Sequence, residues 1–209
     1  MSPLRSSPLR SEDKRALLAV ARKAIFQIVL ERRELRVSSP ADALAVPSGA
    51  FVTLRLRGRL RGCIGRMESE EPLVGVVAQC AAAAAMEDPR FSPVERDELR
   101  DLEIEISVLS ALEIALPDQV EPGRHGLLIS RGHLRGVLLP QVAAEHRWTR
   151  ERFLEETCRK GGLEPEAWKD PETRIEVFTA EIFSESEFRD SNSAGANPGS
   201  ARLDHSSSQ

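Results

Sequence analysis

The sequence has few of the features that mark membrane-spanning, secreted or disulfide-stabilised proteins. No run approaches the roughly 20 apolar residues that cross a bilayer, and the amino terminus lacks the apolar core of a secretory signal. The three cysteines, Cys63, Cys80 and Cys158, are an odd number at wide spacing, which argues against a disulfide framework and against a CxxC-type zinc site. We therefore predict a cytoplasmic protein that makes no membrane contact.

Net charge and aromatic content are also low, and both restrict the class of partner. The net charge is −4 and the sequence pI is about 5.7, so the chain as a whole does not attract nucleic acid electrostatically. Aromatic residues make up 4% of the chain, which leaves few platforms for base stacking. The sequence motifs of phosphate-binding loops, dinucleotide sites, zinc peptidases and serine hydrolases are absent. Any basic binding site must therefore be local.

The 209 residues include 41% hydrophobic side chains, enough for one sizeable domain or for a large and a small one. Apolar residues at helical spacing predict helices over residues 13–34, from Pro72 to Asp88, and around Phe153 and Cys158. Alternating apolar residues predict strands over 51–56, 60–64, 102–108, 126–130, 134–139 and 175–183. Antiparallel hairpins with intervening helices indicate an α+β fold.

Both ends of the chain lack the apolar residues that a core needs. The sequence SPLRS occurs twice in succession near the amino terminus, and the chain from Ser184 onward is dominated by Ser, Asn, Gly and charged residues. We therefore predict a disordered arm over residues 1–12, a folded domain over 13–187 and a disordered tail over 188–209. His205 falls in this tail and receives no role.

The stretch LRLRGRLRGCIGRM predicts a hairpin that places Cys63 among five arginines. A three-residue loop over 57–59 would pair Leu56 with Leu60, so that both leucines face the core. The same register places Cys63 opposite Thr53, on the face away from the core. Glycines near the thiol indicate close approach of another backbone or of a ligand.

Cys63 is the first candidate for chemistry. Arginines beside a thiol favour the thiolate, which is the nucleophilic form of cysteine. The alternative is a half-buried cysteine in a strand that is basic for other reasons. The arginines have two interpretations as well, a solvated basic face or an anion-binding surface. Cys80 lies on an alanine-rich helix, where we predict a packing role.

Two further residues could serve the thiol. His125 stands at the entrance of a strand, where it could act as a base, although a turn residue that satisfies a backbone group is the alternative. Asp88, in the sequence EDPRF, either takes part in catalysis or ends a helix and holds Arg90 in an ion pair. A metal site built from Cys63, His125 and Cys158 has no local ligand pair such as CxxC, so we predict no metal site.

The hexapeptide LRGCIG resembles the signature of the AMMECR domain family, whose bacterial and archaeal members are called AmmeMemoRadiSam system protein A. Further blocks similar to that family follow its order between residues 13 and 187, namely GAFVTL before the hexapeptide and DPRF, EISVL, HGLLI, LLPQVA and CRKGGL after it. One departure is Gly161, where the family usually has alanine. The resemblance implies an antiparallel sheet flanked by helices in a larger domain, with a smaller α+β subdomain beside it.

The resemblance also implies partners, a Memo-type protein and a radical SAM enzyme, but it implies neither a settled reaction nor a cofactor. Matching positions supply the site candidates. The candidates for catalysis are Cys63, His125 and Asp88. The candidates for binding are Arg61, Gly62, Gly65, Arg90, Phe91, Gln141 and Trp148.

Two hypotheses from different classes follow. The first is a modification enzyme that uses Cys63 on RNA or on a small anionic substrate. The second is a non-catalytic binding or adaptor protein that docks a partner or a phosphate ligand through its arginine-rich hairpin. In both hypotheses the sequence supports RNA less well than the other ligands, because no aromatic residue interleaves with the arginines.

Overall fold

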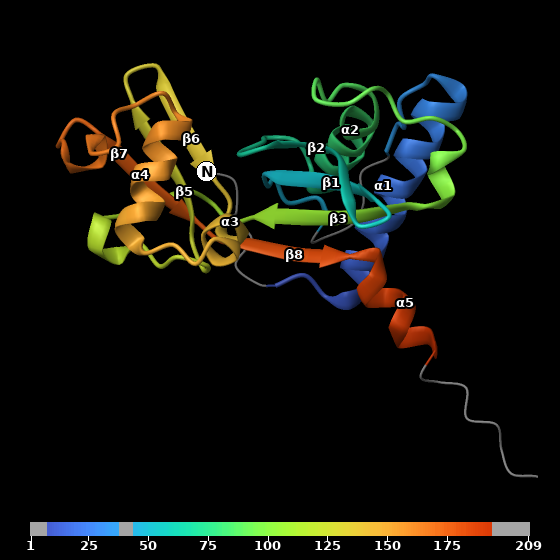
Figure 1. Ribbon diagram of the computed structural model, residues 1–209. Helices are drawn as coiled ribbons and strands as arrows, with labels where there is room; N and C mark the ends of the chain where they lie inside the picture. Colours follow the sequence, from blue (N-terminus) through green and yellow to red (C-terminus); the bar gives the residue numbers. More distant parts are fainter. Residues whose placement is uncertain (1–7, 38–43, 194–209) are drawn as a thin grey trace, which may run out of the picture.

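The computed structural model of the chain describes residues 8–37 and 44–193, which form two lobes (Figure 1). Each lobe contains a four-stranded antiparallel sheet, with strand order β2-β1-β3-β8 in the first and β4-β7-β5-β6 in the second. The predicted α+β fold is therefore confirmed. The first lobe comprises α1 (Ser11–Glu31), β1 (Ala50–Leu56), β2 (Arg59–Arg66), α2 (Leu73–Met86), β3 (Leu102–Leu109), β8 (Ala180–Ser184) and α5 (Glu185–Ser193). The second comprises β4 (Glu113–Ile114), β5 (Gly126–Arg131), β6 (Leu134–Leu138), α3 (Pro140–Glu145), α4 (Arg150–Lys160) and β7 (Arg174–Phe178).

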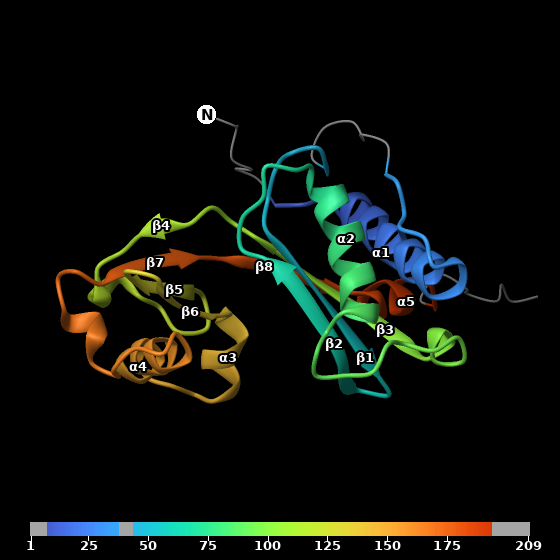
Figure 2. The same cartoon turned by 90° about the horizontal axis from the view of Figure 1, so that it is seen from above.

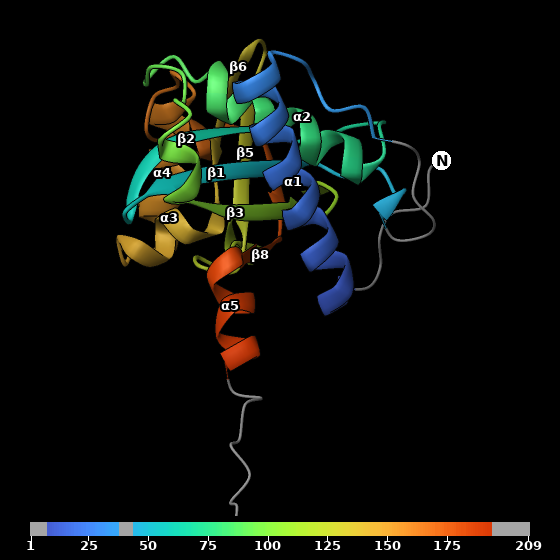
Figure 3. The ribbon, with the colours of Figure 1, turned by 90° about the vertical axis from the view of Figure 1, so that its right-hand side faces the viewer.

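Helices α1 and α2 cover one face of the first sheet (Figure 3). Leu17 and Ile25 of α1 have no exposed surface, as expected for the buried stripe of an amphipathic helix. The alanines of α2 let this helix approach the sheet closely. A Cβ atom on Gly62 would lie 2.1 Å from the carbonyl oxygen of Ala84, so only glycine fits at that point of β2.

The hairpin of β1 and β2 has a different register at its tip from the one predicted. Thr53 pairs with Cys63 as expected, but Leu56 pairs with Arg59, and a bulge follows Leu54. The turn is therefore two residues long, with left-handed φ angles of 51° at Arg57 and 78° at the following glycine, which is the pattern of a type I′ turn. The predicted pairing of Leu56 with Leu60 is wrong. Because the bulge reverses the faces beyond it, Leu60 is 38% exposed instead of buried.

The last predicted strand, 175–183, is divided between the two sheets. Strand β7 ends at Phe178 in the second sheet, and β8 begins at Ala180 in the first. The chain crosses between the lobes a first time after β3 and returns at Thr179, where the Ser110 N–H donates to the Thr179 carbonyl at 2.9 Å. The two lobes are thus joined by two neighbouring segments.

The second lobe has its own core. Helix α4 packs on β5 and β6, and its residues Phe153, Leu154 and Cys158 have no exposed surface. Within the described residues, no helix combines the length and the apolar content that a bilayer crossing needs.

The amino-terminal arm is ordered where the structure describes it. Leu9 is 5% exposed, and its N–H donates to the Glu181 carboxylate at 3.0 Å. The predicted disorder therefore does not hold for residues 8–12, because one leucine of the repeat reaches the core. Residues 1–7 lie outside the described ranges.

The predicted carboxy-terminal tail begins as a helix, α5. Glu185 at its start accepts a hydrogen bond from the Ile104 N–H at 3.1 Å, and Phe188 packs against the core of the first lobe. These two anchors order a segment whose composition alone predicts disorder. The prediction for residues 194–209, His205 included, lies outside the described ranges.

Candidate functional site around Cys63

Cys63 lies on β2, on the face of the first sheet that α1 and α2 do not cover. We call this side, with Phe51, Thr53, Arg55, Cys63, Glu103 and Glu105, the open face. Seen from above, the open face is turned toward the second lobe, on the side of α3 (Figure 2). The Cys63 side chain is half-buried, and the Thr53 hydroxyl lies 3.3 Å from its Sγ atom as a hydrogen-bond donor. The thiol is therefore positioned by the neighbouring strand and is outside the helix-covered core.

Strand β2 is an edge strand, and its main chain at Cys63 is held by an ion pair. The Cys63 N–H donates to Oδ2 of Asp88 at 2.8 Å, and Nη2 of Arg90 donates to the Cys63 carbonyl at 3.5 Å. Both groups point away from β1, and an edge strand would otherwise leave them unpaired. Asp88 and Arg90 thus replace a further strand at the position of the thiol.

The carboxylate of Asp88 is the centre of this arrangement. Its side chain is 3% exposed and accepts two side-chain hydrogen bonds from Arg90, at 2.9 and 2.7 Å. These bonds, reinforced by the Cys63 N–H, hold the pKa of Asp88 well below its usual range. Asp88 is therefore ionised at neutral pH, so it accepts hydrogen bonds and has no proton to donate. Of the two predicted roles, this geometry matches the structural one, an ion pair with Arg90 that follows the end of α2.

Arg61, a candidate for binding, does not extend over the open face. It occupies the bulge, and its guanidinium binds the Glu98 carboxylate at 2.7 Å and the carbonyl oxygens of Ser92 and Pro93. The Arg61 hydrogen bond also lowers the pKa of Glu98. Arg61 therefore fastens the segment after Asp88 along the edge of β2.

The remaining arginines of the hairpin do not form a continuous basic surface. Arg57 pairs with Asp101 and Arg66 pairs with Glu71, each at 3.1 Å. Arg55 has no carboxylate partner among the described residues, and it is the arginine that shares the open face with Cys63. Three of the five arginines in the predicted cluster are thus paired with acidic residues, whereas Arg55 and Arg59 have no ion-pair partner among the described residues.

The two other candidates in the first lobe, Gly65 and Phe91, make packing contacts with aromatic and cationic groups. The Phe51 ring lies against Gly65, where a Cβ atom would be 2.2 Å from the ring, so the glycine makes room for the aromatic side chain. The guanidinium of Arg90 lies 5.4 Å from the centre of the Phe91 ring, within range of a cation–π contact.

The second-lobe candidates are not hydrogen-bonded to the Cys63 site. His125 accepts a hydrogen bond on Nδ1 from the Glu121 N–H at 3.2 Å, which is the turn role that we considered as its alternative. Trp148 stacks on His146 with ring centroids 4.8 Å apart. The Oε1 atom of Gln141 is buried and has no hydrogen-bond partner among the described residues.

Thr53 is the residue that sequence reasoning places correctly but does not select as part of the site. Its hydroxyl is the one side-chain group that hydrogen-bonds to the thiol among the described residues. The hairpin register contains this information, because cross-strand neighbours on one face lie within contact distance. Glu98 gives no comparable signal, since nothing in the sequence links it to Arg61.

The other two cysteines are core residues. Cys80 is 2% exposed and Cys158 has no exposed surface, and burial raises the pKa of both thiols, to about 11 for Cys80. The packing role of Cys80 is confirmed. In the described parts of the chain, no three His, Cys, Asp or Glu side chains are grouped so as to hold a metal ion.

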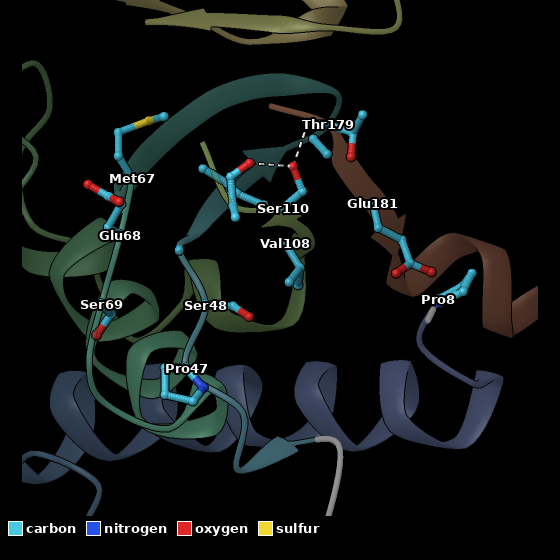
Figure 4. Close-up of a pocket in the computed structure, with 14 residues that line it drawn as sticks. Pro8, Pro47, Ser48, Met67, Glu68, Ser69, Val108, Ser110, Thr179 and Glu181 are labelled. Atoms are coloured by element: carbon cyan, nitrogen blue, oxygen red, sulfur yellow. Dashed lines mark hydrogen bonds between the residues drawn. The ribbon is translucent and has the colours of Figure 1, made fainter. Parts of the chain in front are cut away.

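A cavity of about 480 Å³ lies where the two connections between the lobes meet, and Cys63 does not line it (Figure 4). Ser110 and Thr179 form one wall, where the Thr179 N–H donates to the Ser110 hydroxyl at 2.9 Å. Glu181 lies on another side, and its carboxylate is engaged by Lys14 at 3.0 Å. Residues 88–91 do not line this cavity either, so it is separate from the Cys63 site.

Comparison with known proteins identifies the family. A model of the AMMECR1 family matches residues 18–183, which include the whole Cys63 site. The chain belongs to the AMMECR1 family. A related protein of Methanothermobacter thermautotrophicus is 42% identical over 190 residues, which cover 87% of this chain and 99% of the relative. A Thermococcus kodakarensis protein is 40% identical over 191 residues, covering 85% of this chain and 92% of the relative.

A solved AMMECR1-type structure supports the fold. The crystal structure of the uncharacterized protein PH0010 from Pyrococcus horikoshii has a TM-score of 0.73 and 38% sequence identity, and the match covers 81% of this chain and 90% of that chain. The resemblance carried by LRGCIG is therefore confirmed at the level of the family. The names of these AMMECR1 relatives state no reaction, so the chemistry has to be argued from the site.

Proposed function

We propose that this AMMECR1-family protein is a modification enzyme in which the Cys63 thiol acts as the nucleophile, or as a sulfur-bearing acceptor of a transferred group. The observation that carries the proposal is the support given to one half-buried thiol, whose main chain is held by Asp88 and Arg90 and whose sulfur faces the Thr53 hydroxyl. The two packing cysteines have a different setting, since they are enclosed in the cores. A fixed, accessible sulfur is what a nucleophile requires.

The chemistry of the site follows from these contacts. In a substitution, the Cys63 sulfur bonds to an electrophilic atom, the leaving group departs with its bonding electrons, and the thiol proton passes to water. A hydroxyl donor beside the sulfur stabilises negative charge there, and a held main chain keeps the sulfur in one position. In this proposal Thr53 is a positioning residue, and Asp88 and Arg90 hold the strand.

The charges of the site favour a small anionic substrate over RNA. Arg55 on the open face has no carboxylate partner among the described residues, whereas Arg57, Arg61 and Arg66 are each paired with an acidic side chain. Arg55 is thus the one unpaired hairpin arginine on the open face among the described residues, and a single cation matches one carboxylate or phosphate group. An RNA backbone would need a row of free cations, and single-stranded bases would need aromatic platforms beside them.

The proposal includes the partners that the family resemblance implies. A Memo-type protein and a radical SAM enzyme would supply or consume the group carried on the sulfur.

The rate at which the thiol is alkylated tests the proposed role of Cys63. Iodoacetamide in limiting amount, with peptide mapping by mass spectrometry, should label Cys63 faster than a model peptide of residues 60–66. Thr53→Val should slow this labelling by roughly tenfold, the size of one lost hydrogen bond to a charged group, and Thr53→Ser should restore it. A wild-type rate equal to the rate of the peptide would rule out an activated nucleophile.

A second experiment tests the partners. Incubation with the Memo-type protein and the radical SAM enzyme should change the mass of the peptide that contains Cys63, and Cys63→Ser should abolish the change. If the mass never changes but the partners still bind, the protein is an adaptor.

The adaptor alternative is favoured by one observation, the 38% exposure of Leu60 next to Arg59, an exposed arginine with no ion-pair partner among the described residues. An apolar side chain next to a cation suits a protein partner better than a phosphate ligand. A salt titration separates the two, since phosphate contacts weaken steeply with ionic strength and an apolar contact does not.

A further inference from the structure

The second sheet has an open edge at β4, and an apolar groove lies beside it. Ile114 is 73% exposed and Leu116 is 62% exposed, the two highest values among the large hydrophobic residues described. Figure 2 shows β4 at the margin of the second lobe, next to β7. The adjoining groove has a volume of about 650 Å³ and is lined by Ile114 to Pro117 and by residues 168–175. Exposed apolar patches of this kind mark interaction sites.

The main chain of β4 is free to pair on its outer side. The Ala115 N–H donates to the Ile175 carbonyl at 3.1 Å, toward β7. Since successive N–H groups of a strand point in opposite directions, the N–H and the carbonyl of Ile114 point away from β7. The first sheet meets the same situation at Cys63, where Asp88 and Arg90 satisfy both outward groups. No described residue does this for Ile114.

Two side chains that line the groove carry buried hydrogen-bonding atoms that lack partners. Three buried side-chain polar atoms are unpaired in the described part of the chain, and two of them, Nε1 of Trp168 and Oγ1 of Thr173, belong to side chains that line this groove. Unpaired buried polar atoms are rare in folded proteins, so two at one site point to a missing partner. The indole N–H can only donate, and the partner must therefore bring an acceptor such as a peptide carbonyl.

The charges around the groove indicate which kind of partner fits. Lys169 is paired with Glu166, and Arg174 with Glu176, each at 2.7 Å. Glu172, which lines the groove, and Glu113, which precedes Ile114, are exposed and form no ion pair in the described structure. The unpaired charges beside the groove, those of Glu113 and Glu172, are thus negative, which matches a partner with basic residues.

We propose that β4 and this groove form a binding site for an extended, basic peptide segment of another protein, which adds to the second sheet as a fifth strand. The segment would exchange two main-chain hydrogen bonds with Ile114 and place an apolar side chain in the groove, and its carbonyls would accept from Trp168 and Thr173. A second copy of the chain is the less suitable occupant. It would bring two pairs of unpaired carboxylates, Glu113 and Glu172 of each copy, into one interface.

The proposal is tested by selection from a phage-displayed library of random 12-residue peptides on the full chain. The comparison protein is the double variant Ile114→Lys/Leu116→Lys, whose substitutions lie at exposed positions. The matched control is Leu30→Lys, an exposed leucine of α1 with 44% exposure. We expect peptides enriched more than about tenfold on the wild type and on the control relative to the double variant, with Lys and Arg in excess over Asp and Glu. Equal enrichment on all three proteins, or an excess of acidic peptides, would overturn the proposal. Self-association of the wild type that the double variant loses would assign the edge to a second copy instead.

A spectroscopic readout locates the bound peptide. The chain has two tryptophans, so its ¹H–¹⁵N NMR spectrum contains two indole N–H signals. The signal that is missing from the spectrum of Trp168→Phe is that of Trp168. An enriched basic peptide should shift the Trp168 signal and leave that of Trp148 in place, and the reverse result would contradict the site. Trp168→Phe should also weaken peptide binding about fivefold, because it removes the N–H that would donate to a peptide carbonyl.

Discussion

The hydrogen bond between the Asp88 carboxylate and the Cys63 N–H of the edge strand can be tested directly by substitution. Asp88→Ala removes the acceptor of the Cys63 N–H and both side-chain bonds from Arg90. A hydrogen bond to a buried charged group contributes roughly 1.5–3 kcal/mol, and the Arg90 pair adds at most about 1 kcal/mol, because its guanidinium is 54% exposed and screened by water. We therefore expect a loss of about 3 kcal/mol in the free energy of unfolding at pH 7.

Urea unfolding followed by circular dichroism measures this loss. In thermal melts, about 3 kcal/mol corresponds to a decrease of roughly 6–12 °C for a chain of this length. Arg90→Gln is the matched control, and it should cost about 1 kcal/mol because Asp88 keeps its bond to the Cys63 N–H. A loss below about 1 kcal/mol for Asp88→Ala would mean that the ion pair does not hold the strand.

The pH dependence of the difference in free energy of unfolding between wild type and Asp88→Ala provides a second check. The pKa of Asp88 is lower in the folded chain than in the unfolded chain, where it lies near 3.9. The ionised carboxylate therefore stabilises the fold fully above about pH 5, and this contribution is lost as the pH falls through 4 and below. The gap between wild type and Asp88→Ala should shrink over that range. A gap that stays constant down to pH 3 would refute the electrostatic explanation.

Three further outcomes follow from the structure. Gly62→Ala should destabilise the chain by about 2 kcal/mol or more in urea titrations, because the added Cβ would meet the backbone of α2. Gly58→Ala, in open space at a φ of 78°, should cost about 1 kcal/mol, and similar losses for both variants would contradict the close approach of α2. Glu185→Ala should cost about 2 kcal/mol, because its carboxylate binds the Ile104 N–H, and an unchanged midpoint would show that α5 is not anchored. In the folded chain at pH 8, mass spectrometry should find alkylation at Cys63 and none at Cys80, because Cys80 is buried and its thiol has a pKa of about 11. Equal labelling of the two cysteines would indicate that helix α2 opens readily.

The sequence by itself determined most of the secondary structure, because the burial of one face imposes a period on the apolar residues. The stripe of α1 and the alternation in β3 were both visible, and both elements form where the pattern predicts them. The pairing of Thr53 with Cys63 was also predictable, since the hairpin loop is short and the register follows from the core-facing residues. The family followed from the order of the short motifs in the same way.

Tertiary structure alone decided how these elements are combined. A bulge, which no hydrophobic periodicity encodes, placed the Leu60 side chain on the face opposite to the predicted one and directed Arg61 toward Glu98. Asp101 and Glu98, which are distant in sequence, paired with two of the arginines that looked like a cluster in the sequence, Arg57 and Arg61. The division of 175–183 between two sheets, and the helix that follows it, depended on anchors such as Glu185 that bind residues about 80 positions away. Long-range contacts of this kind leave no local signature, because their energy comes from partners brought together only by the fold.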